Sequence, residues 1–504
     1  MFFRSIMMDP QLHILYILML TPPMLLTAEE KYFLIRLLAG YRATQLNENI
    51  LISKTIKELE NDLGMTETQI KTARDSLTMK GLLTRCPFYR NPAKKQGRPR
   101  EGFNIVPLNI PDDFHPTFQK LSHRDLISIL LLWDSSYANV IKQTRESGIG
   151  NLSPANRITL SILLAHANLC GVVRNLGHAQ LAKLTGLITQ DRVDSQLNKL
   201  TELGYIYSQI AGVTGKYLFG RQTGAFFLNL WSDNLIYKKS NISFIEFSNN
   251  KPDLYKECFW GAVPFTKLVY EEKIAIKNKK VDSYTKSITE LKEYLNSLAS
   301  SQMYYSFKNV TTKNLITDDK IYNFKYYQIE FINNEIWSWV SKFNIFDLSS
   351  FFQERHLMDF IQYKINQYAS QFLSNFWLKQ DFHKSYDDLL YIEKKVFFSD
   401  FLPKSYKSDS TDGKETLQDI KIDALKFFIY RLTVDVALFA KSILLDKFDN
   451  PQHLFLNDRY EIVSFKHTIV HKSYPHMITK FAIIRYHSRN DVIPIKLHIP
   501  NNLS

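Results

Sequence analysis

The chain has 504 residues, which is longer than one ordinary domain. Its content of 45% hydrophobic and 22% charged residues is typical of a folded globular protein and excludes a disordered chain. A formal net charge of +13 favours an anionic partner, either nucleic acid or a membrane surface. Cys86, Cys170 and Cys258 are widely separated and lack metal-ligand spacing, so we expect a reducing, cytoplasmic location.

Residues 1–26 form an apolar N-terminal segment. Its apolar run, residues 12–20, is too short to span a bilayer, and no small-residue cleavage site follows it. We therefore expect a buried helix and no membrane partner. The alternative is an upstream extension of the true start, because four internal methionines could each begin translation: Met7, Met8, Met19 and Met24.

The next segment, residues 27–108, is the first of two similar modules. Thr27 and Glu30 form a capping-box pattern ahead of an apolar-periodic helix. A short helix is predicted over 56–63 and ends at Gly64. Thr66 then caps another helix, with Gln69 three residues later and Ile70, Ala73 and Leu77 facing inward; Gly81 ends it, and strands are predicted at 82–89 and 103–108.

A second copy of this pattern is predicted over 153–230, after a linker and helix at 109–152. The offset between the copies is 122 residues, and one inserted residue near Ile188 changes it to 123. A second glycine-rich loop follows at 212–224, where the first copy has its basic loop. The matched pairs are Leu59 with Leu181, Gly64 with Gly186, Ile70 with Val193, and Gly81 with Gly204.

The remainder, residues 235–504, is predicted to be one mixed helical and strand domain without a named fold. The fold class predicted for the whole chain is therefore α+β, mainly helical. Helical periodicity extends over 282–299, 349–378 and 416–447; strand patterns occupy 321–332 and 461–470; and 404–415 is a polar loop.

The order of helices, turn glycines and a strand pair around a basic loop resembles the winged helix-turn-helix superfamily, and the tandem copies are similar to bacterial transcription regulators and plasmid replication initiators. The resemblance covers 27–108 and 153–230 and depends on hydrophobic spacing and turn glycines. It implies that the second helix of the turn motif enters the major groove of DNA, and that the hairpin, the wing, contacts phosphate or minor groove.

In the first copy, the residues agree with that implication. With Ile70 inward, Thr68 and Thr72 point outward, and Gln69 and Lys71 flank them, beside the helix start at Thr66. Asp75, near the end of the same face, is unfavourable for a phosphate contact. The wing adds Lys94, Lys95, Arg98 and Arg100, within a stretch, residues 80–100, of seven cations and no acid; the alternative is a solvated surface loop.

The second copy presents a less basic surface. Asp191 and Glu202 lie on its outward face and Asp194 on the flank, where they would repel phosphate. Contact with DNA and a role in packing or homodimerisation are both open for this copy. Its candidate DNA-binding residues are Arg192, Lys199, Lys216 and Arg221.

No pattern in the chain predicts a cofactor, a metal or a catalytic site. His467, His471 and His476 fall in a strand-like segment, where positions four apart are too distant to share one ion, and neither phosphate-binding glycine motif is present. We expect a double-stranded DNA-binding protein that acts by occupying a site, as a transcriptional regulator does. The alternatives are a replication initiator of a mobile element, a protein-interaction scaffold, and a nuclease-like enzyme in the C-terminal half.

Overall fold

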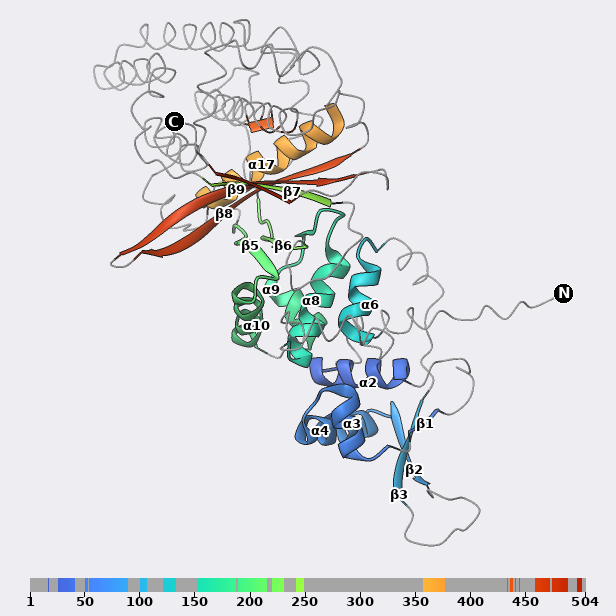
Figure 1. The fold of residues 1–504 in the computed structure, drawn as a ribbon. Helices are drawn as coiled ribbons and strands as arrows, with labels where there is room; N and C mark the ends of the chain where they lie inside the picture. The colour runs from blue at the N-terminus through green and yellow to red at the C-terminus, as the bar shows by residue number, and fades with distance from the viewer. Residues whose placement is uncertain are drawn as a thin grey trace, which may run out of the picture. The chain divides into compact units, whose positions relative to one another are not determined.

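In the computed structural model, the described residues are mixed helix and strand and about 54% helical, which is consistent with the α+β prediction. It divides into two compact units (Figure 1): unit 1 is Met1–Tyr207 with Phe226–Lys238, and unit 2 is Ser208–Ala225 with Lys239–Ser504. No helix among the described residues is long and apolar enough to cross a membrane. The described residues are 17, 26–40, 50–52, 54–88, 100–106, 121–132, 152–186, 189–214, 220–230, 242–248, 357–376, 433, 436, 437, 440, 444, 458–471, 474–487 and 496–500.

The described residues of the first module form three helices and a three-stranded antiparallel sheet. The sheet order is β1-β3-β2, so the first strand pairs with the third. Both predicted capping boxes form: the Thr27 and Thr66 hydroxyls accept from the Glu30 and Gln69 amides, and the Glu30 and Gln69 side chains accept in return. The elements are α2 (Ala28–Gly40), β1 (Ile50–Ile52), α3 (Ile56–Leu63), α4 (Glu67–Met79), β2 (Leu83–Phe88) and β3 (Arg100–Ile105).

The second module repeats the same order of elements. Its sheet order, β4-β6-β5, again places the third strand between the first and the second. The turn glycines predicted from the repeat adopt the left-handed conformation, with φ of +64° at Gly64 and +73° at Gly186. The elements are α8 (Pro154–His166), β4 (Val172–Arg174), α9 (His178–Thr185), α10 (Gln190–Glu202), β5 (Ile206–Ile210) and β6 (Ala225–Leu228).

Within unit 1, α2 of the first module packs against α8 of the second, and α6 (Arg124–Leu132) packs against both helices. The side chain of Lys31 on α2 is fully buried and donates a hydrogen bond of 2.6 Å to the Leu184 carbonyl at the end of α9. A Cβ atom at Gly186 would lie 2.0 Å from the Leu26 carbonyl oxygen. The turn of the second module is therefore closely packed against the start of the first.

Among its described residues, unit 2 contains a four-stranded sheet of order β10-β7-β9-β8 and the helix α17 (Leu357–Phe376), which packs on β8. Hydroxyls of Ser374 and Ser370 accept hydrogen bonds from the Tyr460 and Ile462 amides of β8, so side chains of the helix satisfy donors of the edge strand. The strands are β7 (Ile242–Ser248), β8 (Arg459–His471), β9 (Tyr474–Tyr486) and β10 (Lys496–Pro500).

Helix α17 confirms the helix predicted over 349–378, and β8 confirms the strand predicted over 461–470. Residues 433, 436, 437, 440 and 444, inside the segment predicted as a helix over 416–447, are helical. Three other predicted segments lie outside the described residues: 282–299, 321–332 and 404–415. Most of the apolar segment 1–26 also lies outside them.

Candidate nucleic-acid interface

Helix α4 has one buried face and one exposed face. Ile70, Ala73 and Leu77 are at most 1% exposed, as their spacing predicts. The opposite side carries the candidate base-reading residues, and there Thr68 and Thr72 are exposed. Hydroxyl groups on an exposed helical face can hydrogen-bond with the edges of bases.

The start of α4 is held by its own side chains. Thr66 and Gln69, both predicted as DNA-binding residues, form the capping box, with a bond of 3.0 Å from the Thr66 amide to Gln69 Oε1. Lys71 is exposed, and its ammonium lies 2.6 Å from Glu67 one turn earlier. Thr66 and Gln69 thus have a structural role at this helix, and the charge of Lys71 is partly offset by an exposed neighbouring acid.

Asp75 on α4 is paired with two arginines. Its Oδ1 accepts hydrogen bonds from Arg74 at 3.0 and 3.1 Å and from Arg85 of β2 at 3.1 Å. The Arg74 guanidinium also lies over the ring of Phe103 in β3, 5.1 Å from its centroid. These contacts join α4 to both strands of the hairpin, and the two arginines offset the negative charge of Asp75 near the face predicted to contact DNA.

The β2–β3 hairpin is the base of the basic loop. Phe88 pairs with Arg100, so the strands are in register up to the ends of the loop. The backbone of Arg100 begins β3. The other three predicted wing residues, Lys94, Lys95 and Arg98, lie outside the described residues.

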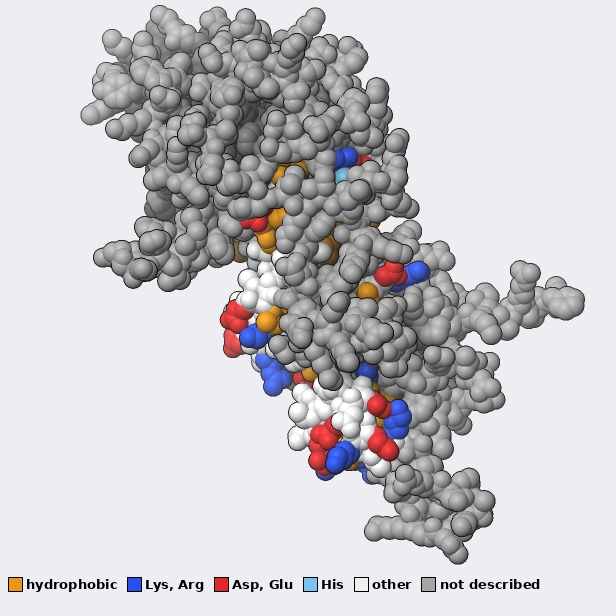
Figure 2. Space-filling model, viewed as in Figure 1, with side chains coloured by type: hydrophobic (Ala, Val, Ile, Leu, Met, Phe, Trp, Pro, Cys, Tyr) orange, Lys and Arg blue, Asp and Glu red, His pale blue; other side chains and the backbone are white. Residues whose placement is uncertain are grey.

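Helix α10 of the second module has the same arrangement of faces. Val193, Leu197 and Leu200 are buried, and Arg192 and Lys199 are exposed. Lys199 lies 3.3 Å from Glu202, and Asp194 lies 3.0 Å from the ring of His178, a pair that is ionic when the imidazole is protonated. In Figure 2, acidic and basic side chains are interspersed over α3, α4 and α10.

The loop of the second module is described only in part. Arg221 is exposed beside the isolated bridge between Val213 and Gln222, whereas Lys216 lies outside the described residues. The cations of α10 itself lie among acids, with Lys199 beside Glu202. The surface of α10 is therefore less favourable for phosphate than that of α4.

Unit 2 holds a separate polar cluster, which is buried. Ser243 Oγ and His487 Nε2 are 2.5 Å apart, and Arg485 Nε donates to Asp458 at 2.6 Å. Burial lowers the pKa of His487 to about 4. The exposed fractions of Ser243, His487 and Asp458 are 0%, 0% and 2%, and His487 Nδ1 lies 3.9 Å from the Asp458 carboxylate, too far for a hydrogen bond. The Ser243 side chain is buried, and we interpret the cluster as part of the core.

The described residues contain no group of three or more His, Cys, Asp or Glu side chains placed to hold a metal ion. Comparisons with protein-family models, with curated proteins and with solved structures found no match to the chain. A function can therefore be assigned to the chain only from the geometry of the two modules.

Proposed function

We propose that the protein is a cytoplasmic double-stranded DNA-binding protein that acts by occupying its site, as a transcriptional regulator does. The observation that carries this proposal is the topology of the two modules. Each has the order helix, strand, helix, helix, strand, strand, and in each sheet the third strand lies in the middle. This is the arrangement expected of a winged helix-turn-helix module, in which the third helix reads the major groove.

The side chains of the first module support the same assignment. Thr68, Lys71 and Thr72 are exposed on one helix, and that helix is tied to the hairpin by Arg85. The loop that joins the hairpin strands holds Lys94, Lys95 and Arg98 in the sequence. Phosphate contacts from the loop would supply sequence-independent affinity, and hydroxyl contacts from α4 would supply discrimination between bases.

Binding to a random duplex measured across salt concentrations tests the proposal. Each phosphate contact contributes about −0.9 to the slope of log affinity against log salt. Lys94→Ala, Lys95→Ala, Arg98→Ala and Arg100→Ala together should weaken binding to every duplex and reduce the slope by about 2 to 4. A matched pair of single variants controls for the loss of charge: Arg100→Ala should reduce the slope, and Arg124→Ala on α6 should leave it unchanged.

Base reading requires a selected target. Sequencing the duplexes that the protein retains from a random library would provide one, and Thr68→Ala or Thr72→Ala should then change the preferred sequence. An equal loss of affinity for all sequences would show that α4 does not read bases. A flat salt slope for the unaltered protein would instead favour a protein-interaction scaffold. Mapping the selected site to a promoter or to an iterated origin separates the regulator from a replication initiator.

A further inference from the structure

The last residue of α4, Met79, exposes an apolar side chain to solvent. Its exposed fraction is 83%, and among the residues whose side chains the structure describes it is the only large apolar residue that is exposed. Covering apolar surface of this kind with a partner is favourable. Because a single exposed methionine can also be without function, its position on the helix decides what it can contact.

Met79 lies on the same face of α4 as the candidate base-reading threonines. At 3.6 residues per turn, Thr68, Thr72 and Met79 lie within about 40° of one another around the helix axis. Both threonines are exposed as well. At about 1.5 Å per residue, Met79 lies about 10 Å beyond Thr72 along the axis, which corresponds to about three base pairs. The methionine thus extends the exposed stripe of α4 past the threonines.

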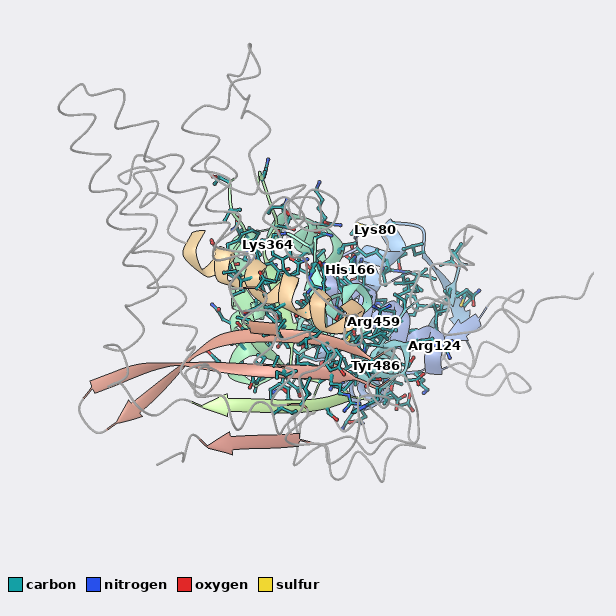
Figure 3. The ribbon with its side chains drawn as sticks, turned by 90° about the horizontal axis from the view of Figure 1, so that it is seen from above. Lys80, Arg124, His166, Lys364, Arg459 and Tyr486 are labelled. Atoms are coloured by element: carbon teal, nitrogen blue, oxygen red, sulfur yellow. The ribbon has the colours of Figure 1, made fainter. Side chains whose placement is uncertain are left out.

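The backbone that carries Met79 is fixed by a Schellman motif at the end of α4. The Leu82 amide donates to the Leu77 carbonyl at 2.9 Å, around Gly81, whose φ is +72°. Lys80, which is labelled in Figure 3, follows Met79 and forms the C-cap of the helix. The position of the methionine is therefore set by an ordered helix end, whereas its flexible side chain can adapt to a partner.

The second copy shows that the fold does not require an apolar residue at this position. Helices α4 and α10 both contain 13 residues, and the alignment of Ile70 with Val193 places Met79 opposite Glu202, the last residue of α10. Glu202 is exposed too. Packing within a module therefore gives no reason for a methionine here, whereas a ligand of the first module gives one.

We infer that Met79 is a specificity-determining residue that contacts the C5-methyl group of a thymine in the major groove. The inference rests on the proposed function and names a feature of the base sequence that α4 recognises. In the major groove, thymine is distinguished by this methyl group, which an apolar side chain can contact. The thioether side chain of methionine is long and polarisable and packs well against such a surface. The alternative is a helix end in solvent without a ligand.

The test uses the unaltered full chain and a duplex selected from a random library, in which each thymine is replaced in turn by deoxyuridine. Uracil lacks only the methyl group, so the hydrogen-bonding groups of the base are preserved. One replacement should weaken binding about 2- to 5-fold, as the burial of one methyl group predicts.

Variants of the chain then assign that effect to a residue. Met79→Ala should weaken binding to the thymine duplex and should remove the difference between thymine and uracil at that position. Met79→Leu is the matched control: it keeps an apolar side chain, so the difference should remain. Thr72→Ala should also leave the difference at that position unchanged. Because Met79 is exposed, its variants should unfold at the same temperature as the unaltered chain, and the uracil measurement needs no variant at all.

The outcomes that overturn the inference are distinguishable from those that overturn the proposed function. If no uracil replacement changes affinity, or if Met79→Ala leaves the difference intact, Met79 contacts no thymine methyl group and the proposed function stands. If the chain retains no preferred sequence but has a steep salt slope, α4 does not read bases, and DNA binding stands without this contact. If the chain has no affinity for any duplex, the proposed function and the inference both fail.

Discussion

Asp75 of α4 accepts a hydrogen bond from Arg85 of β2 at 3.1 Å, across the turn that separates the helix from the hairpin. The same carboxylate accepts from Arg74, whose guanidinium covers Phe103 of β3. An acid on the exposed side of α4 thus aligns two elements that the proposed function requires to contact one duplex. Its pairing with two arginines explains how an acid can be tolerated on the helix face proposed to contact DNA.

Asp75→Asn should raise affinity for random duplex at about 0.1 M salt by a few fold, because it removes a negative charge and leaves two arginines available for phosphate. Discrimination between a selected site and random duplex should fall, since the helix and hairpin are less firmly aligned. Stability should change by less than about 1 kcal/mol, because the pair is exposed. Fluorescence anisotropy on both duplexes measures the two effects, and a drop in random-duplex affinity would contradict the prediction.

Thr66→Ala should destabilise the first module by about 1 kcal/mol, because the Gln69 amide loses its acceptor at the start of α4. Thr66→Ser keeps the hydroxyl and serves as the control. Hydrogen exchange over residues 67–79 localises the loss. Equal protection of this helix in both variants would mean that the cap contributes little.

The paired turn glycines offer a comparison between the two copies. Gly64→Ala should cost about 1 to 2 kcal/mol, because the backbone is left-handed but nothing lies within 4 Å of the added Cβ. Gly186→Ala should cost about 3 kcal/mol or more, since the same strain is joined by a Cβ 2.0 Å from the Leu26 carbonyl. Chemical unfolding measures both, and equal costs would show that the Leu26 contact is absent in solution.

Lys31 makes stability depend on pH. Burial lowers its pKa from the usual 10.5 to about 7, so between these values the unfolded chain binds the extra proton and the folded chain does not. The free energy of unfolding should therefore rise with pH from about 7 to about 10.5, by at most about 1.4 kcal/mol per pH unit. Lys31→Met should lack this rise, as seen in unfolding curves at pH 7, 8 and 9. A rise of the same size in the variant would assign the effect to other groups.

Interactions between residues close together in the sequence made much of unit 1 predictable. The capping boxes of α2 and α4 and the left-handed glycines after α3 and α9 are formed by residues a few positions apart. The first strand of each module, Ile50–Ile52 and Val172–Arg174, was missed, because three residues are too few to show alternation.

Contacts between distant positions could not be predicted in the same way. Lys31 and Leu184 are 153 residues apart, and a lysine in an amphipathic helix gives no sign that it will be buried. Arg85, in contrast, is only ten residues from Asp75, and its charge was a usable signal once the turn at Gly81 was recognised. The length of β8 and β9 beyond β7 depends on register, which single-sequence patterns do not specify.

The bond between Lys31 and the end of α9 also decides how the protein should be dissected. A fragment carrying either copy alone would break that bond and uncover the surface on which Gly186 rests, so its weak binding would report damaged folding and not the share of that copy in recognition. Point substitutions in the intact chain are the appropriate tools for apportioning affinity between the copies.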